Sequence, residues 1–391
     1  MRFAVLSVLF CFIATGCATT GLPPVTKDLR LEDDERRLWN RSEEEEKVIN
    51  RSGLIYRDKE LETYLNEVPQ KLLPSEIFVH IPFKIIVVRN HLFNAFAYPN
   101  GVIYVHTGIL ARMDNEAQFA TLLAHEMTHA THRHLVEQFR DIKNKTAFLA
   151  TIQVTTAGLG VFGGLASFIG AIGTIAAVTG YSREHETEAD SEGFKLMADA
   201  GYDPKEAQKL FMHLKKELEE EKRKEPYFFG THPKIVERLE NYETLLKAKS
   251  HEERGGILNT EIFLKNISRL ILDNARDDLK AGRFKIAERG VEKYLGTNSE
   301  SAEAYCLLGD IRRQRGEGDD IERAKDHYQR AISINLSYPD SHKGVGLIYY
   351  KRGEKTLAKK ALEFYLSLSP HALDRGHIEE YIHQCQEGGK Q

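Results

Sequence analysis

His125-Glu126-Met127-Thr128-His129 is the stretch that most constrains how this chain folds, because it sets two histidines four residues apart with an acidic residue between them. Residues i and i+4 share one face of an α-helix, so His125 and His129 can bind one metal ion if the stretch is helical. Glu126 would then reach a water molecule held by that ion. The pattern therefore predicts a zinc site on a helix, where activated water attacks a peptide carbonyl.

The residues around this stretch predict the helix that it needs. Asp114 is suited to be the N-cap, and Glu116 in the first turn favours the positive end of the helix dipole. Apolar residues then recur with helical spacing in one stripe, with the two histidines along its border. We therefore expect an amphipathic helix that holds the ligands at the floor of a cleft. The stripe comprises Phe119, Leu122, Leu123, Met127 and Ala130.

A catalytic zinc site also needs a third protein ligand. No glycine lies between His129 and Gly158, so the layout in which a glycine turn delivers a further histidine is absent. His132 lies one turn beyond the pair and His134 lies off the shared face. We expect structural or solvated roles for these two histidines rather than metal ligation.

The segment 183–193 offers an acidic residue as the third ligand. Its sequence, REHETEADSEG, contains Glu184, Glu186 and Glu188. On a helical wheel Glu186 falls on the apolar face, whereas Glu184 and Glu188 project to the opposite side. A carboxylate on an apolar face is costly unless it is paired or metal-bound, which predicts Glu186 as the ligand. Asp190, one turn on, can hydrogen-bond a ligand imidazole.

The first residues differ from the rest of the chain. Arg2 precedes an apolar run, Phe3–Ile13, that is too short to span a bilayer and is typical of a secretory signal. Small residues followed by Cys17 resemble a bacterial lipobox. We predict that residues 1–16 are a lipoprotein signal peptide, that the Cys17 thiol is lipidated, and that residues 17–30 form a tether.

Cysteine usage and charge add two further expectations. Once the signal is removed and Cys17 is acylated, Cys306 and Cys385 are the remaining cysteines, and an exported protein could pair them. The 54 Lys and Arg against 58 Asp and Glu give a net charge of −4, which offers no sign of nucleic-acid binding.

Between the ends, the pattern predicts a mainly helical peptidase domain, residues 31–250, with a few strands. Pro69 would kink or end the second of its helices. Pro99-Asn100-Gly101 would form the turn between two strand-like pieces. The predicted elements are helices over 31–50 and 59–73, a strand over 83–88 and strand pieces within 95–106.

Residues 146–182 contain no charged side chain and many glycines, and they connect the two metal-bearing helices. The segment is long enough to span a bilayer. A single crossing would place Glu186 across the membrane from His125. We therefore favour an apolar hairpin beside the cleft, then a membrane-touching surface, then a spanning hairpin.

Residues 260–391 show a repeat of about 34 residues that resembles the tetratricopeptide repeat. Three repeats and a capping helix fit, forming an α-solenoid whose concave face binds partner segments. A plain helical bundle is the alternative, and the aligned glycine and alanine positions disfavour it. The triplet Ala324, Tyr328 and Ala331 is matched by Ala358, Leu362 and Tyr365, and Leu308-Gly309 by Val345-Gly346.

Together, HEMTHATHRH, NAFAYPNGVIYVHTGIL, EHETEAD and Thr231-His232-Pro233 resemble metallopeptidase family 48. These are gluzincins related to the CaaX prenyl protease and the mitochondrial Oma-type protease. With the export signal and the repeats, the chain looks most like the BepA-type periplasmic members. The resemblance implies a mainly α fold with a small β-sheet, followed by the repeat solenoid.

The resemblance also implies roles for individual residues. It implies one Zn²⁺ on the three ligands named above, Glu126 as general base and Asp190 behind a ligand. His232 and Arg238 would donate hydrogen bonds to the oxyanion of the reaction. His232 could also swing inward and close the zinc site at rest. The stretch 101–106 would be an edge strand that pairs with the substrate backbone.

We thus expect a zinc metalloendopeptidase of the bacterial cell envelope, held to the outer membrane by its lipid and facing the periplasm. Its substrates would be misfolded or stalled envelope proteins, and its repeats would contact the outer-membrane assembly machinery. A periplasmic chaperone or scaffold with a structural or latent zinc site is the rival function. A membrane-embedded prenyl-type protease is the rival enzyme.

Overall fold

A computed structural model of the chain describes residues 21–26, 29–144, 181–221, 235–248 and 255–387. Several predictions from the sequence lie outside the described residues. These are the signal peptide 1–16, the lipidation of Cys17, the oxyanion and closing roles of His232, and the role of nearly all of the apolar segment 146–182. Within the described part of the chain, no helix is both long and apolar enough to cross a bilayer.

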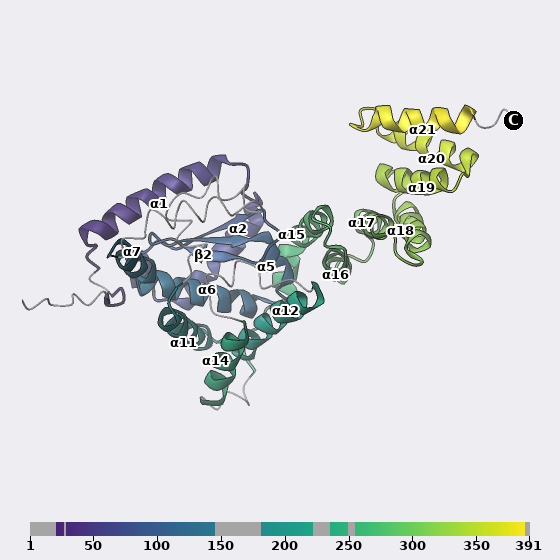
Figure 1. Cartoon of the computed structure of the whole chain (residues 1–391). Helices are drawn as coiled ribbons and strands as arrows, with labels where there is room; N and C mark the ends of the chain where they lie inside the picture. The colour runs from purple at the N-terminus through teal and green to yellow at the C-terminus, as the bar shows by residue number, and fades with distance from the viewer. Residues whose placement is uncertain (1–20, 27–28, 145–180, 222–234, 249–254, 388–391) are drawn as a thin grey trace, which may run out of the picture.

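A three-stranded sheet lies at the centre of the N-terminal body (Figure 1). Its strands are β1 (Lys84–Val88), β2 (Ala95–Ala97) and β3 (Val102–His106). The order is β1-β3-β2, with β1 parallel and β2 antiparallel to β3. The predicted turn joins β2 to β3, and Gly101 adopts a φ of +86° there, which glycine tolerates at no steric cost.

The strand order corrects one expectation. The stretch that the sequence predicts as an edge strand is β3, which is central, so it has no edge to offer a peptide. The edge strand on that side is β2. Its neighbours Asn94 and Tyr98 both bond β3, through His106 N to Asn94 O at 2.9 Å and Tyr98 N to Val102 O at 2.8 Å. Because antiparallel strands alternate, Ala95 and Ala97 direct their backbone groups to the other side.

The two faces of the sheet support two separate cores, as the period of two along a strand requires. Ile85 and Val87 of β1 point into the core beneath the sheet, which also contains the apolar residues of α6 (Glu116–Thr131). Ile86 and Val88 point the other way, into the core beneath α1 (Asp33–Arg51). Figure 1 shows α1 on one side of the sheet and α6 on the other.

The remaining helices of the body surround these cores. Pro69 ends one predicted helix and starts the next, at the first helical position where its missing N–H is harmless. The helices are α2 (Lys59–Glu67), α3 (Pro69–Leu72), α4 (Ser75–His80), α5 (Thr107–Arg112), α7 (His134–Asn144), α11 (Arg183–Asp199), α12 (Lys205–Glu221) and α14 (Ile235–Ala248).

Helix α6 corrects two predictions made from its sequence. Every one of its residues is buried, so it is a central helix rather than an amphipathic one with a wet face. Its N-cap is Asn115, whose side chain accepts a hydrogen bond from Gln118 N at 3.0 Å. Asp114, the predicted cap, instead pairs with Lys293 of the repeat region, with its Oδ1 3.2 Å from the Lys293 Nζ.

Residues 255–387 form three helical hairpins and a final helix, as predicted for three repeats and a cap. Glycines at the matching positions Gly309 and Gly346 allow close packing: a Cβ on Gly309 would clash with the ring of Tyr328, and one on Gly346 with the side chain of Leu362. Cys306 and Cys385 are both buried free thiols, so the predicted pairing is wrong. The helices are α15 (Thr260–Lys280), α16 (Phe284–Leu295), α17 (Ala302–Arg315), α18 (Asp320–Ile334), α19 (Pro339–Lys351), α20 (Lys355–Leu368) and α21 (Arg375–Glu387).

The predicted boundary at residue 260 does not separate two cores. It falls at the start of α15, whose Phe263, Ile267, Leu270 and Ile271 belong to the core beneath the sheet. The same helix continues into the core of the first repeat. The repeats are therefore built onto the body through a shared helix rather than a linker.

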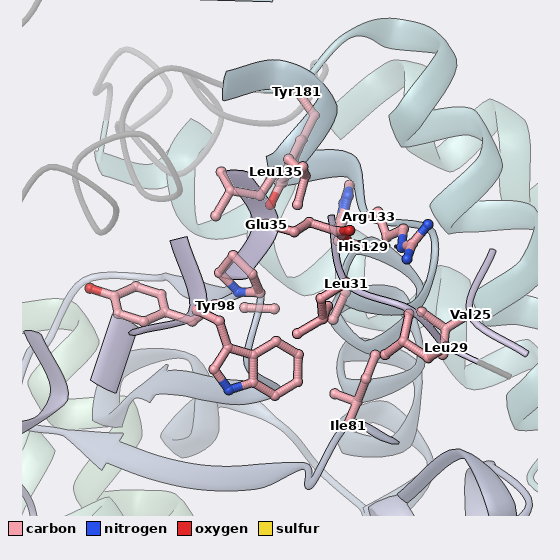
Figure 2. A pocket seen from close by; sticks show the side chains of 15 residues that line it. Val25, Leu29, Leu31, Glu35, Ile81, Tyr98, His129, Arg133, Leu135 and Tyr181 are labelled. Carbon is pink, nitrogen blue, oxygen red and sulfur yellow. Dashed lines mark ion pairs between the residues drawn. The ribbon is translucent and has the colours of Figure 1, made fainter. Parts of the chain in front are cut away.

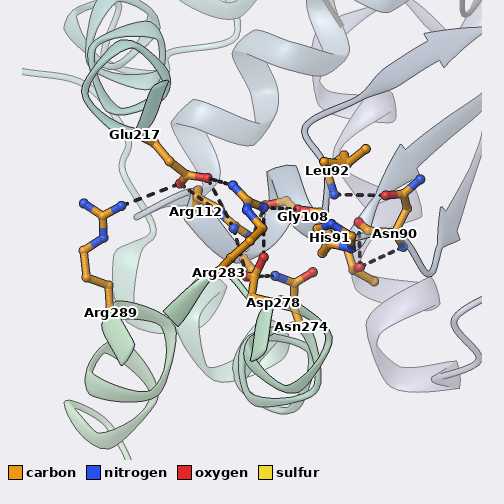
Figure 3. Close-up of polar contacts among 12 residues, drawn as sticks. Asn90, His91, Leu92, Gly108, Arg112, Glu217, Asn274, Asp278, Arg283 and Arg289 are labelled. Atoms are coloured by element: carbon orange, nitrogen blue, oxygen red, sulfur yellow. Dashed lines mark hydrogen bonds and ion pairs between the residues drawn. The ribbon is translucent and has the colours of Figure 1, made fainter. Parts of the chain in front are cut away.

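A buried network of charges reinforces this junction (Figure 3). Arg112 of α5 contacts Asp278 of α15 at 2.9 Å and Glu217 of α12 at 3.2 Å. Arg283 contacts the same two carboxylates, at 2.9 Å and 2.5 Å. Each arginine thus bridges the body and the repeats.

Candidate metal centre

His125, His129 and Glu186 come together at the contact between α6 and α11. One ligand atom from each lies within 4.8 Å of the others, and the three are the only such group among the described residues. The two Nε2 atoms are 3.0 Å apart, and Glu186 oxygens lie 3.4 Å from His129 Nε2 and 3.6 Å from His125 Nε2. All three side chains are at most 1% exposed. The structure therefore assembles the predicted ligand set.

A glycine sets the distance between the two helices. A Cβ on Gly193 of α11 would lie 2.9 Å from the backbone nitrogen of His125, closer than real side-chain carbons come. The absence of a side chain lets α11 lie directly against α6. At the other end, Ser182 caps α11 by accepting from His185 N. Together these features place Glu186 in the first turn of α11, opposite the two imidazoles.

Behind His125 lies a charged and fully buried support. Asp190 Oδ1 is 3.1 Å from His125 Nδ1, as the sequence predicts for a residue that orients this ligand. Arg238 holds Asp190, with Nη2 2.5 Å from the same oxygen. The Tyr242 hydroxyl donates to that oxygen at 2.9 Å, and burial together with the Asp190 carboxylate raises the pKa of Tyr242 well above its ordinary value.

The placement of Arg238 corrects its predicted role. The guanidinium is 1% exposed, packs over the ring of Phe211 at 4.2 Å, and directs its nitrogens to Asp190 and to Nδ1 of His125. It therefore lies behind the ligand, on the Nδ1 side of His125. These contacts are those of a residue that positions Asp190 and His125 rather than those of an oxyanion donor. The other predicted donor, His232, lies outside the described residues.

A different support lies behind His129. Its Nδ1 is 2.9 Å from Nδ1 of His134, and His134 Nε2 is 3.2 Å from Glu188 Oε2. Tyr181 stacks on the His129 ring, with centroids 3.8 Å apart and planes at 13°. Neither His134 nor Tyr181 was a candidate from the sequence. Glu188, expected to face away from the site, is half-exposed and turned toward His134.

The chain conformation explains why His134 could not be placed from the sequence. Helix α6 ends at Thr131, and Arg133 adopts a φ of +62° before α7 begins at His134. A helical wheel continued past Thr131 therefore assigns the wrong direction to every later residue. Only the observed turn shows that His134 folds back onto His129.

The balance of charge indicates that the site suits a cation. Three buried carboxylates, those of Glu126, Glu186 and Asp190, lie in the same region, and one buried guanidinium, that of Arg238, accompanies them. Buried charges are costly unless they are compensated. Two imidazoles and a carboxylate are also the donor set that zinc takes in hydrolytic enzymes. The residues present thus fit a divalent zinc ion.

A small apolar pocket adjoins His129 (Figure 2). Its free space is about 20 Å³, on the order of one water molecule, and residues of the N-terminal segment form part of its lining. Val25 and Leu29 line it, and the backbone nitrogen of Val25 bonds Thr131 O at 2.7 Å. The described part of the predicted tether therefore packs against the end of α6.

In a comparison with known proteins, one family model matches most of the N-terminal body of the chain. Residues 59–246 match the family model described as "Peptidase family M48". That match contains both metal-bearing helices and the buried arginine behind them.

Two curated relatives illustrate the range of the similarity. The beta-barrel assembly-enhancing protease of Escherichia coli is 28% identical over 193 residues, which cover 48% of this chain and 39% of that protein. The mitochondrial metalloendopeptidase OMA1 of Schizosaccharomyces pombe is 30% identical over 183 residues, which cover 47% of this chain and 52% of that protein. The matched stretch thus spans about half the length of these relatives or less.

One solved structure shows a weak similarity to this chain. The crystal structure of MamA protein matches 46% of this chain and 82% of its own, at 22% identity and a TM-score of 0.28. This score is too low to define a shared fold.

Proposed function

Residues 59–246 belong to peptidase family M48, and we propose that the chain is a zinc-dependent endopeptidase. The observation that carries the proposal is the buried set of two histidines and Glu186, with Glu126 on the same helix as the histidines. A scaffold with a structural zinc needs four closed ligands and no base. Among the described residues three ligands converge, which is the number that catalytic zinc sites take from the protein.

The proposed chemistry divides between the ion and the protein. A zinc ion held by the three ligands supplies a Lewis acid that makes water more acidic and polarises a peptide carbonyl. Glu126 takes the proton from the attacking water and gives it to the leaving amine. Asp190, whose Oδ1 is 3.1 Å from His125 Nδ1, orients the imidazole so that Nε2 is the atom that faces the ion. His232 remains the proposed donor to the oxyanion.

We propose that the substrate binds as an extended strand along β2. Ala95 and Ala97 direct their backbone groups away from β3, and no described strand pairs with that side. Ala97 also lines the pocket beside His129, so a peptide on this edge would run past the metal ligands. Recognition through backbone hydrogen bonds predicts loose sequence specificity, as suits a protease that removes misfolded chains.

The proposed cellular role rests on the sequence of residues 1–17 and on the repeats. We propose export through residues 1–16, lipid attachment at Cys17 and a place on the periplasmic face of the outer membrane. The substrates would be unfolded or misassembled envelope proteins, with the repeats contacting the assembly machinery of the outer membrane. Relatives called beta-barrel assembly-enhancing proteases support this proposal. No nucleic acid is expected as a partner.

The decisive test replaces the proposed base. Glu126→Gln keeps the size of the side chain but removes its ability to take a proton, so casein hydrolysis should fall about 10²–10⁴-fold. Bound zinc, measured by elemental analysis, should stay at one ion per chain. Glu184→Gln changes an exposed glutamate on α11 and is the matched control.

Each outcome of this test separates the candidate functions. Loss of hydrolysis with retained zinc, together with inhibition of the wild type by phenanthroline, supports the endopeptidase. Undiminished hydrolysis by Glu126→Gln would remove Glu126 from the reaction. A wild-type protein that binds zinc and unfolded chains but cleaves none would establish the rival chaperone or scaffold.

A further inference from the structure

The support behind His129 has no counterpart among the predicted site residues. It runs from His129 through His134 to Glu188, with hydrogen-bond distances of 2.9 Å and 3.2 Å. His134 is 1% exposed, whereas the Glu188 side chain is 49% exposed. The chain of contacts therefore begins at a buried metal ligand and ends at the surface.

The chemistry of the two imidazoles fixes the direction of these hydrogen bonds. His129 faces Glu186 and His125 through Nε2, so a metal ion would take the Nε2 lone pair and leave the proton on Nδ1. That N–H can donate only if Nδ1 of His134 is an acceptor. His134 must then carry its own proton on Nε2, from which it donates to Glu188.

The surroundings of His134 favour this single arrangement. His134 is buried among other rings, and its centroid is 5.0 Å from that of His129. The ring of His185 stacks on it, with centroids 4.3 Å apart and planes at 9°. His185 is itself held by Glu137, whose Oε2 is 2.8 Å from His185 Nε2. The position of the His134 ring is thus fixed on its face as well as at its edges.

We propose that His134 is a positioning residue of the metal centre, which holds His129 in one tautomer and orientation and passes part of the positive charge to Glu188. The proposal rests on the zinc site of the proposed function, but it concerns metal binding rather than proteolysis. His125 is supported by a buried carboxylate, and His129 is supported by a neutral imidazole with a surface carboxylate behind it. The second support is the one that solvent can reach.

The test measures zinc affinity by chelator competition in full-length protein carrying Glu126→Gln, so that proteolysis cannot disturb the measurement. His134→Leu should raise the Kd for zinc about 10–100-fold, the usual effect of losing a partner of a ligand histidine. His134→Asn should restore most of this affinity, because its Oδ1 offers an acceptor where Nδ1 of the imidazole lies. The visible spectrum of the Co²⁺-loaded protein should change in His134→Leu and return toward wild type in His134→Asn.

His132→Leu is the matched control. His132 lies at the same helix end and is 3.7 Å from Glu188, but it touches no metal ligand. Its substitution should leave the Kd within about twofold of wild type, below the 10-fold effect expected at His134. Because Glu188 is half-exposed, Glu188→Leu tests the end of the chain without disturbing the core, and it should weaken zinc binding less than His134→Leu.

Two results would overturn the proposal. One is an unchanged Kd in both His134→Leu and Glu188→Leu. The other is a loss of affinity in His134→Leu that His134→Asn does not restore, since that loss would reflect packing alone. If His134→Leu does not fold, the Asn and Glu188 variants decide. Failure of the proposed function gives a different result. In that case the wild-type protein binds zinc, His134→Leu weakens this binding, and no peptide is cleaved.

Discussion

The metal centre and the junction between the body and the repeats both bury charged side chains, yet the charges sum differently. In the metal centre, Glu126, Glu186 and Asp190 bring three carboxylates, and Arg238 brings one guanidinium. Among the described residues of this centre, carboxylates outnumber guanidinium groups by two. A divalent cation would remove that excess.

The junction is balanced without any added group (Figure 3). Arg112 and Arg283 each contact both carboxylates, Glu217 and Asp278, and the more exposed Arg289 also reaches Glu217 at 4.0 Å. Burying charge is costly in both places, but the junction compensates it within the chain. The difference teaches that carboxylates gathered beside imidazole nitrogens, rather than buried charge itself, mark the candidate metal site.

Asp190→Asn should have the largest effect on this comparison. It leaves the guanidinium of Arg238 buried without its carboxylate and removes the acceptor behind His125, so we expect a loss of about 3–5 kcal/mol in the free energy of unfolding. Zinc affinity should fall as well. Urea denaturation with EDTA measures the first effect, and chelator competition measures the second.

Asp278→Asn is the matched change at the junction. Glu217 still contacts both arginines, so the expected loss is about 1–3 kcal/mol. Zinc affinity should not change. An equal loss of zinc affinity in the two variants would break the distinction between a functional and a structural cluster.

Glu186→Gln sharpens the comparison by acting in opposite directions with and without metal. In the metal-free protein it replaces a buried carboxyl group by a neutral amide of the same size, and stability should rise by on the order of 1–3 kcal/mol. With zinc present, the loss of a ligand should lower stability below that of wild type. Thermal unfolding with EDTA and with added zinc checks both signs; a metal-free protein that loses stability would refute the charge argument.

Two glycines that allow helices to pack closely provide the last comparison. Gly193→Ala places a Cβ against the backbone of His125, so it should cost about 1–3 kcal/mol and also weaken zinc binding. Gly290→Ala, at the junction, meets the Cβ of Ala275 at 3.1 Å and should affect stability alone. Chemical denaturation and zinc titration of both variants provide the comparison.

Much of the metal centre could be predicted because helical geometry repeats every few residues and fixes which side chains share a face. His125 and His129 share a face of any helix, and Glu186 is separated from its neighbours by helical phase alone. Pro69, Gly101 and the repeat period likewise act on the local backbone, and the structure follows each of them.

Other features could not be read from the chain. The sequence predicts Asp114 as the N-cap of α6, but the Asp114 side chain pairs with Lys293, and Asn115 is the N-cap. The position of Arg238 after His232 in the sequence suggests an oxyanion donor, but the direction of its side chain depends on Asp190, which lies on another helix. Cys306 and Cys385 lie on α17 and α21, and their pairing depends on how those helices stack.

The sequence by itself determined the ligand set and the helices that carry it, because backbone geometry repeats every few residues and carries side-chain direction along one element. Tertiary structure decided which strand lies at the edge of the sheet, which groups lie behind the ligands, and that His134 folds back onto His129. The left-handed turn at Arg133 ends the helical phase, so beyond it only packing determines where a side chain points.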